Sequence, residues 1–278
     1  MEANWIDRRV LVVGGTGFVG SHLVRALIAR GAKVCVTSQG STLPWRLKDI
    51  EGSYAHEVLA LPDTDSAKSL FENVKPEYIF YVAGALPGHG ADAAAYEHAN
   101  VEGVRDVFEN APHKTLRSFT LMGTASEYGP IDVPTTEIME EKPEESYGTS
   151  KLRATRYAMS AGLKTGTTTT VLRSPATYGP FQGFTTFIPN CILACLEKRE
   201  FPMSGEQQMD FLYIDDLVSA LLLAGQRTAG ITAEIINISN GKPDTLADVA
   251  YAIADALDAK TYLKVGTLPL RPYERHLR

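Results

Sequence analysis

The chain has 278 residues, of which 44% are hydrophobic and 22% charged, and its formal net charge is -6. These values are typical of a globular protein with one large core or two interleaved domains. The acidic balance, without any Lys/Arg-rich run, disfavours nucleic acids and anionic membranes as partners. The longest apolar stretch, 217–225, is too short to span a bilayer, and residues 1–7 lack the apolar core of a signal peptide.

The three cysteines, Cys35, Cys191 and Cys195, form an odd and unpatterned set, which predicts a reduced, cytoplasmic protein. Cys191 and Cys195 stand four residues apart in an apolar helical run, and no nearby His or Cys pair completes a metal site. We therefore expect buried thiols that pack as small hydrophobic groups, and no metal.

Short apolar runs alternate with helical patterns over the first 174 residues. We expect strands at 9–13, 33–37, 78–83, 118–122 and 168–174, and helices at 18–30, 66–73, 91–110 and 147–161. This alternation predicts an α/β fold, a Rossmann-type doubly wound parallel sheet with helices on both faces.

Beyond residue 174, prolines and glycines punctuate the chain and the expected elements become shorter. We predict a dinucleotide-binding Rossmann domain over 1–174, to which 210–238 return. The segments 175–209 and 239–278 are expected to form a smaller mixed lobe that binds substrate.

The first expected strand ends in a glycine-rich turn that opens a helix. Glycines let the backbone turn tightly and approach a pyrophosphate, and the helix N-terminus favours the anion. The turn therefore predicts dinucleotide binding, rather than a glycine-rich connection that binds nothing, through Gly14, Thr16, Gly17, Phe18, Val19 and Gly20.

The end of the second strand bears on the choice between NAD and NADP, because a carboxylate there accepts from the ribose hydroxyls of NAD. Residues 36–42 carry no acid. Ser38 and Gln39 can donate to a 2′-phosphate, and Arg46 follows within reach. We expect NADP(H), with NAD bound without a carboxylate as the alternative.

Tyr147 and Lys151 stand at i and i+4, so they share one face of a helix. A neighbouring ammonium and a cationic nicotinamide are expected to lower the pKa of the phenol, so that Tyr147 exchanges a proton near neutral pH. Thr124, at the end of the fourth expected strand, places a hydroxyl on the reacting oxygen. The alternative is a surface Tyr and Lys on an amphipathic helix, which the upstream phosphate turn disfavours.

Several motifs in the same order resemble the extended short-chain dehydrogenases/reductases of the nucleotide-sugar epimerase, dehydratase and 4-ketoreductase kind. The resemblance covers about residues 8–271 and is carried by segments 14–20, 83–84, 100–103, 124–129, 147–151, 172–173, 178–180 and 210–216. It implies that Ala83 and Gly84 bind cofactor, that Asn100 organises the active-site helix and its water, and that Arg173 is structural. It also implies a homodimer formed through the helices that carry Asn100 and Tyr147.

Within that family, 4,6-dehydratases resemble one another in a Thr-Asp-Glu or Thr-Ser-Glu strand end. Here Ala125 and Ser126 fill the two positions after the threonine, and the acid, Glu127, comes one place later. This resembles some 4-ketoreductases, which use NADPH. A 4-epimerase that keeps NAD bound is the alternative, and a non-catalytic dinucleotide-binding protein is a third hypothesis.

The resemblance implies a small-molecule substrate, a nucleotide sugar, although two expected groups are replaced. Ala176 stands where relatives carry Asn, and Met209 where they carry the Arg that binds the diphosphate. The expected substrate contacts are Thr124, Ser126, His89 and Arg271.

Overall fold

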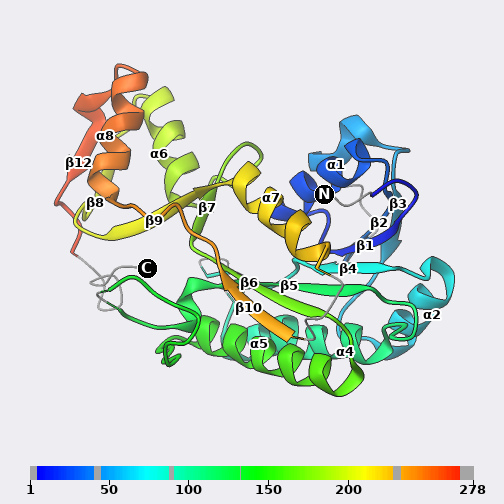
Figure 1. The fold of residues 1–278 in the computed structure, drawn as a ribbon. Coiled ribbons are helices and arrows are strands. Elements are labelled where there is room, and N and C mark those ends of the chain that lie inside the picture. Colours follow the sequence, from blue (N-terminus) through cyan, green and yellow to red (C-terminus); the bar gives the residue numbers. More distant parts are fainter. Residues whose placement is uncertain (1–4, 41–44, 88–90, 132, 228–232, 270–278) are drawn as a thin grey trace.

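The structure is a computed structural model, and it describes residues 5–40, 45–87, 91–131, 133–227 and 233–269. Its centre is a seven-stranded sheet with strand order β10-β6-β5-β4-β1-β2-β3 (Figure 1). Every neighbouring pair in this sheet is parallel. The strands are β1 (Arg9–Val13), β2 (Lys33–Ser38), β3 (Ala55–Val58), β4 (Tyr78–Tyr81), β5 (Ser118–Thr124), β6 (Thr169–Ser174) and β10 (Ala233–Asn237).

Helices cover both faces of this sheet, which is the doubly wound architecture expected from the alternating pattern. One face packs on α1 (Phe18–Ala29) and α7 (Ile214–Gly225). The other face packs on α2 (Thr64–Val74), α4 (Gly103–Asn110) and α5 (Ser146–Thr165). The inner strands are apolar on both sides because both faces are covered, so they read as continuous hydrophobic runs.

A third, smaller apolar cluster lies beyond the central sheet, between α6 (Phe187–Leu196) and α8 (Leu246–Ala256) (Figure 1). Two small sheets accompany it, with strand orders β11-β9-β7 and β12-β8. Their strands are β7 (Ala176–Tyr178), β8 (Phe201–Met203), β9 (Gln208–Tyr213), β11 (Pro243–Thr245) and β12 (Leu263–Val265). The mixture of parallel and antiparallel pairs fits the shorter elements expected after residue 174.

The structure departs from the expected elements in two places. The single helix expected over 91–110 is instead α3 (Ala93–Tyr96), a π-helical segment (Glu97–Glu102) and α4. The edge strand β3 gave no hydrophobic signal, because its sequence, Ala-His-Glu-Val, is largely exposed. Short 3-10 helices add Trp45–Ile50, Ala125–Glu127 and Lys260–Tyr262.

The strand order reverses between β1 and β4, because β2 and β3 lie on one side and β5, β6 and β10 on the other. In open parallel sheets such a reversal opens a crevice at the carboxyl ends of the strands, where ligands bind. The turns that leave β1 and β4 meet here. A Cβ atom at Gly14 would lie 2.7 Å from the backbone of Ala83, so only glycine allows the two turns to approach this closely.

Candidate active site

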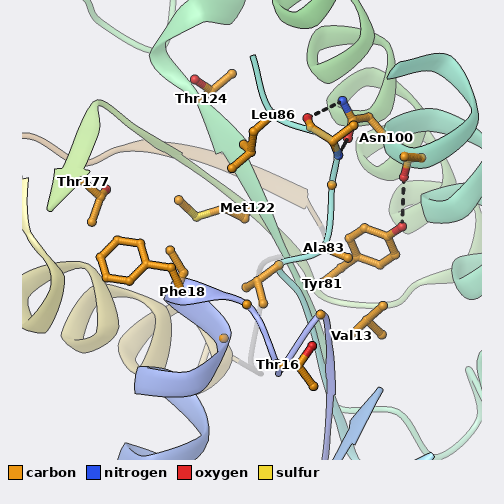
Figure 2. A pocket seen from close by; sticks show the side chains of 18 of the residues that line it. Val13, Thr16, Phe18, Tyr81, Ala83, Leu86, Asn100, Met122, Thr124 and Thr177 are labelled. Carbon is orange, nitrogen blue, oxygen red and sulfur yellow. Dashed lines mark hydrogen bonds between the residues drawn. The ribbon is translucent and has the colours of Figure 1, made fainter. Parts of the chain in front are cut away.

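A cavity of about 740 Å³ occupies this crevice (Figure 2). Its wall takes residues from the turns after β1, β2, β4 and β5, from α5 and from the segment after β6. The predicted residues that the structure brings together here are Gly14, Thr16, Gly17, Phe18, Val19, Gly20, Ser38, Gln39, Arg46, Ala83, Gly84, Asn100, Thr124, Tyr147 and Lys151.

The glycine turn presents the start of α1 to the cavity. Gly17 is the N-cap and makes no side-chain cap bond, and the first turn of the helix carries no acid. The first N–H groups of a helix have no partner within it, and the helix dipole favours an anion at this end. A Cβ at Gly20 would lie 2.2 Å from the Gly14 carbonyl oxygen, so the tight turn itself requires glycine. This cradle fits the pyrophosphate of a dinucleotide.

The far end of the cavity lies at the end of β2. The Ser38 hydroxyl donates to the Gly40 carbonyl and lies 2.7 Å from His56 Nε2 on β3. The Arg46 guanidinium lies 4.5 Å from the Trp45 ring centroid, and its Nε donates to the Phe181 carbonyl at 2.9 Å. Arg46 also lines the cavity.

The loop after β7 is attached to this same end. His22 Nε2 lies 2.8 Å from the Pro180 carbonyl, and the Phe181 ring packs near His22, Trp45 and the Arg25 guanidinium. Phe181 has a φ of 67°, which an L-residue rarely adopts. The loop continues through Gln182 and Gly183 into the cavity wall, so one segment lines both the cofactor end and the opposite wall.

Thr124, Tyr147 and Lys151 meet at the other end of the cavity. Thr124 ends β5, Tyr147 and Lys151 lie on the first turns of α5, and all three line the cavity. Lys151 Nζ donates to the Met122 carbonyl. A Cβ at Gly148 would lie 2.5 Å from the Ser126 carbonyl oxygen, so glycine is what lets α5 approach the end of β5.

The pKa values of Tyr147 and Lys151 are shifted in opposite directions. Burial raises the pKa of Tyr147 to about 12, and burial lowers the pKa of Lys151 to about 8. The Lys151 ammonium donates to the Met122 carbonyl, and the raised pKa of Tyr147 keeps its phenol neutral near pH 7.

Asn100 is buried in the π-helical segment beside α5. Its Nδ2 donates to Ser150 Oγ at 3.0 Å, and its Oδ1 accepts from the Ala85 backbone N–H at 2.9 Å. A Cβ at Gly84 would lie 2.6 Å from this Oδ1 atom. Asn100 thus ties the chain that leaves β4 to α5.

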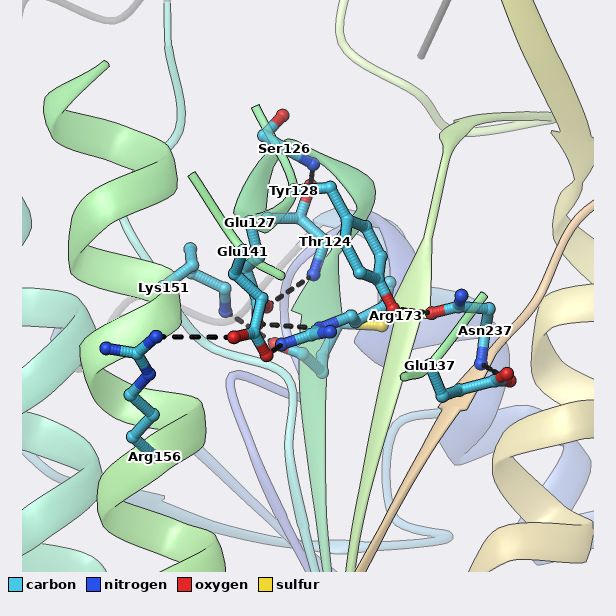
Figure 3. Close-up of polar contacts among 11 residues, drawn as sticks. Thr124, Ser126, Glu127, Tyr128, Glu137, Glu141, Lys151, Arg156, Arg173 and Asn237 are labelled. Atoms are coloured by element: carbon cyan, nitrogen blue, oxygen red, sulfur yellow. Dashed lines mark hydrogen bonds and ion pairs between the residues drawn. The ribbon is translucent and has the colours of Figure 1, made fainter. Parts of the chain in front are cut away.

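The charges on the cavity wall are few and of one sign. Within the described parts of the chain, Arg46 and Lys151 are the charged side chains on the wall, and no carboxylate lines it. Glu127 is turned away from the cavity and is fully buried: one oxygen accepts from Thr124 N at 2.9 Å and the other from Arg173 Nε at 2.8 Å (Figure 3). Arg173 makes buried contacts with Glu127 and Glu141, in line with the structural role implied for it.

Three of the expected substrate contacts are not placed at the cavity. Ser126 lies outside the lining, and its backbone N–H donates to Thr124 Oγ1. His89 and Arg271 lie outside the described residues. Met209, at the position of the expected arginine, packs against the cluster between α6 and α8.

Sequence reasoning missed several polar residues of the wall. They are Ser174 at the end of β6 and, beyond it, Thr177, Gln182, Thr185 and Thr186, none of which belongs to the motif segments 172–173 and 178–180. His56 was also missed, because its exposed strand gave no signal and only its register with β2 places it beside Ser38.

No group of three or more metal-binding side chains is present among the residues that the structure describes. The three cysteines are free and buried. No helix in the described segments is long and apolar enough to cross a membrane.

Comparisons with known proteins agree with this geometry. Residues 10–239 match the model of a family described as the NAD dependent epimerase/dehydratase family. The chain is 26% identical to dTDP-glucose 4,6-dehydratase of Salmonella typhimurium over 279 aligned residues, which cover 90% of this chain and 77% of that protein. It is 27% identical to the human dTDP-D-glucose 4,6-dehydratase, over 83% of this chain and 69% of that protein.

Solved structures extend the similarity. UDP-glucose 4-epimerase of Thermotoga maritima, solved with UDP-glucose, superposes with a TM-score of 0.83 at 25% identity, over 96% of this chain and 88% of that one. MoeE5 in complex with UDP-glucose and NAD superposes with a TM-score of 0.81 at 26% identity, over 97% and 87% of the two chains.

Proposed function

The chain belongs to the NAD dependent epimerase/dehydratase family and is an extended short-chain dehydrogenase/reductase enzyme, and on that premise we propose that it is an NADP(H)-dependent 4-ketoreductase that acts on a nucleotide-linked keto sugar. The substrate class follows the relatives, whose names specify dTDP-glucose and UDP-glucose. The direction of the reaction and the choice of cofactor follow from the residues of this chain.

The absence of a carboxylate from the described cavity wall carries the proposal. Eliminating water from a sugar needs an acid and a base beside the hydride-transfer set. Glu127, the acid next in sequence to the reacting end of β5, is buried against Arg173 and Thr124 N and does not reach the cavity. Ala125 and Ser126 offer no carboxyl group, so the geometry supports ketone reduction over dehydration, despite the dehydratase names of the relatives.

Bound in the cavity, NADPH would supply the hydride for the keto carbon. The hydroxyl groups of Thr124 and Tyr147, which both line the cavity, bind the keto oxygen. Tyr147 gives its phenolic proton to that oxygen as the alkoxide forms. Lys151, held by the Met122 carbonyl, keeps a positive charge beside the phenol and stabilises the phenolate that is left.

The adenosine end of the cavity supports NADPH. The end of β2 bears Ser38 and Gln39 and no acid, and Arg46 lines the same end of the cavity. A guanidinium binds phosphate bidentately, and the Trp45 ring holds it in place. This set matches a 2′-phosphate better than the paired hydroxyls of NAD.

The first test is to denature the purified protein and identify any released dinucleotide by mass spectrometry, then to supply NADPH or NADH with nucleoside diphosphate 4-keto sugars. We expect NADP(H), and NADPH oxidation that depends on the sugar. Tyr147→Phe should lower kcat by about 10²–10⁴-fold with NADPH affinity nearly unchanged. Turnover that survives this change would refute the mechanism.

A 4-epimerase with bound NAD is the second candidate. The epimerase of Thermotoga maritima, at 25% identity, superposes over nearly the whole chain, and an epimerase uses the same Thr, Tyr and Lys. In the same experiment, stoichiometric NAD and exchange of a sugar's C4 configuration without net cofactor oxidation would select the epimerase.

We further propose that the segments 175–209 and 239–278 bind the sugar nucleotide and that the enzyme is a cytoplasmic homodimer through the helices carrying Asn100 and Tyr147. The wall residues Thr177, Gln182 and Thr186 support the first point. For the second, α4 and α5 lie side by side on one outer layer of the sheet, where two copies could pair (Figure 1). Light scattering of the purified protein tests the dimer.

A further inference from the structure

Beside the cavity, but outside it, lies a buried ionic cluster built around Glu127 (Figure 3). Its carboxylate and the Arg173 side chain are both fully inaccessible to solvent. Arg173 also contacts Glu141 at 2.8 Å, and Glu141 in turn reaches Arg156 on α5 at 3.2 Å. Buried ion pairs are costly to assemble, so a cluster of this kind contributes less to stability than an apolar one would. Stability therefore does not explain why this cluster lies next to Thr124, Tyr147 and Lys151.

Glu127 is bonded directly to the backbone of a catalytic residue. Its Oε1 accepts from the Thr124 N–H at 2.9 Å, and the Thr124 hydroxyl in turn accepts from Ser126 N, which forms a capping box. This arrangement fixes the backbone of Thr124, which lines the cavity together with Tyr147. The other oxygen of Glu127 is held by Arg173 on β6, the strand that pairs with β5, so the carboxylate cannot turn away.

The same carboxylate is a buried negative charge close to the proton-transfer pair. The Glu127 charge raises the pKa of the Lys151 ammonium, against the larger effect of burial, which lowers it. It also adds to the burial that raises the pKa of Tyr147. Both effects favour a neutral phenol and a charged ammonium, which are the forms that ketone reduction starts from. At an inaccessible site the charge is screened weakly.

We infer that Glu127 is a positioning residue for the reaction: it fixes Thr124 and maintains the charge of the Tyr147 and Lys151 pair without touching substrate. This inference rests on the proposed reductase function, and it explains why an acid stands one place later than in the dehydratases. The other titratable or charged groups that face this region are Tyr96, Tyr128, Glu137, Glu141, Arg156 and Arg173.

The test compares Glu127→Gln with Glu141→Gln. A glutamine at 127 removes the charge and one of two acceptors, while Arg173 keeps its contact with Glu141. The control, Glu141→Gln, removes a negative charge that contacts Arg173 but leaves the bond between Thr124 N and Glu127. For Glu127→Gln we expect kcat to fall about tenfold, less than the 10²–10³-fold that follows loss of a direct donor, with the KM for NADPH unchanged and the alkaline limb of the pH profile moved to lower pH. The control should keep the wild-type pH profile.

Glu127→Asp separates the two parts of the inference, because it keeps the charge but is too short to bridge Thr124 N and Arg173. We expect it to restore the pH profile while kcat stays low. An unchanged pH profile and kcat in a folded Glu127→Gln protein would overturn the inference.

Failure of the proposed function has a different signature, namely a wild-type protein that reduces no keto sugar. In that case the titration of Lys151, followed by NMR of protein labelled with ¹³Cε-lysine, still decides the inference. The resonance is assigned with Lys151→Arg. A Lys151 titration that does not move to lower pH in Glu127→Gln would refute the electrostatic part.

Discussion

At the scale of single residues, the site is defined by which groups are buried with which partners. Lys151 is buried and donates to the Met122 carbonyl. The Glu127 carboxylate accepts from the Thr124 backbone N–H and forms an ion pair with Arg173. Lys151 therefore lines the cavity, whereas Glu127 lies behind its wall.

The protonation of Lys151 predicts how the rate depends on pH. Burial lowers its pKa from 10.5 to about 8, and the ammonium, the form that supports the reaction, exists below that pKa. The kcat/KM for reduction should therefore be constant near neutrality and fall as pH rises through about 8. Tyr147, whose pKa is about 12, keeps its proton throughout this range. Steady-state kinetics from about pH 6 to about pH 10 measures this limb, and a flat profile across that range would contradict the assignment.

Arg46 predicts the cofactor preference. Arg46→Ala removes the cation that we assign to the 2′-phosphate, so NADPH should bind on the order of 10- to 100-fold more weakly, as for loss of a charge-assisted bond. NADH, which lacks that phosphate, should bind within about twofold of wild type. Fluorescence titration with each nucleotide measures both constants. Arg30→Ala, at an exposed arginine whose guanidinium donates to the Ala26 carbonyl of α1, serves as the control. Equal losses for the two nucleotides would remove Arg46 from the role.

At the scale of elements, the chemistry depends on how closely helix α5 approaches the end of β5. Gly148 faces the Ser126 carbonyl, and Asn100 ties the preceding helical segment to Ser150 one turn further along α5. The helix is thus held from two sides, by a close backbone contact and by a buried amide.

Gly148→Ala tests this approach. Its Cβ would lie 2.5 Å from a backbone oxygen, so the helix must shift. We expect a loss of roughly 1–3 kcal/mol in the free energy of unfolding, as for an overpacked site, and a fall in kcat larger than that in NADPH affinity. The neighbouring Thr149→Ala, on the exposed side of the same turn, should change neither. Urea denaturation measures the stability of both variants, and steady-state kinetics measures their kcat. A Gly148→Ala protein with wild-type stability and kcat would show that the close approach of Gly148 to the Ser126 carbonyl is not needed.

At the scale of the whole molecule, the cavity joins parts of the chain that are distant in sequence. The turns after β1, β2 and β4 form one end, and β5 and α5 form the other. The loop after β7 crosses to His22 and Arg46. A cofactor that spans this cavity would contact all of these segments, and its binding free energy would add to the stability of the folded state.

NADPH should therefore raise the melting temperature of the protein. A ligand at 100 times its Kd stabilises the folded state by about 2.7 kcal/mol, which corresponds to a rise of several degrees for a chain of this size. NADH at the same concentration should give a smaller rise. Differential scanning fluorimetry measures both. Equal shifts would argue against the preference, and no shift with either nucleotide would argue against cofactor binding.

The sequence by itself determined the parallel doubly wound sheet, the glycine turn, the Thr124, Tyr147 and Lys151 set and the absence of an acid after β2. These features depend on local patterns: buried parallel strands are continuous apolar runs, and a phosphate turn or an i, i+4 pair is written within a few consecutive residues. The family and the fold class were both readable at that level.

The tertiary structure alone decided how those groups are used. Whether Glu127 faces the cavity or Arg173 depends on the pairing of β5 with β6, and whether His56 meets Ser38 depends on the register of an exposed edge strand. The pKa values of Tyr147 and Lys151 are set by burial, which the spacing of two side chains on a helix does not reveal. Contacts between distant segments carry no local signal, because they arise only when the sheet and its helices have packed.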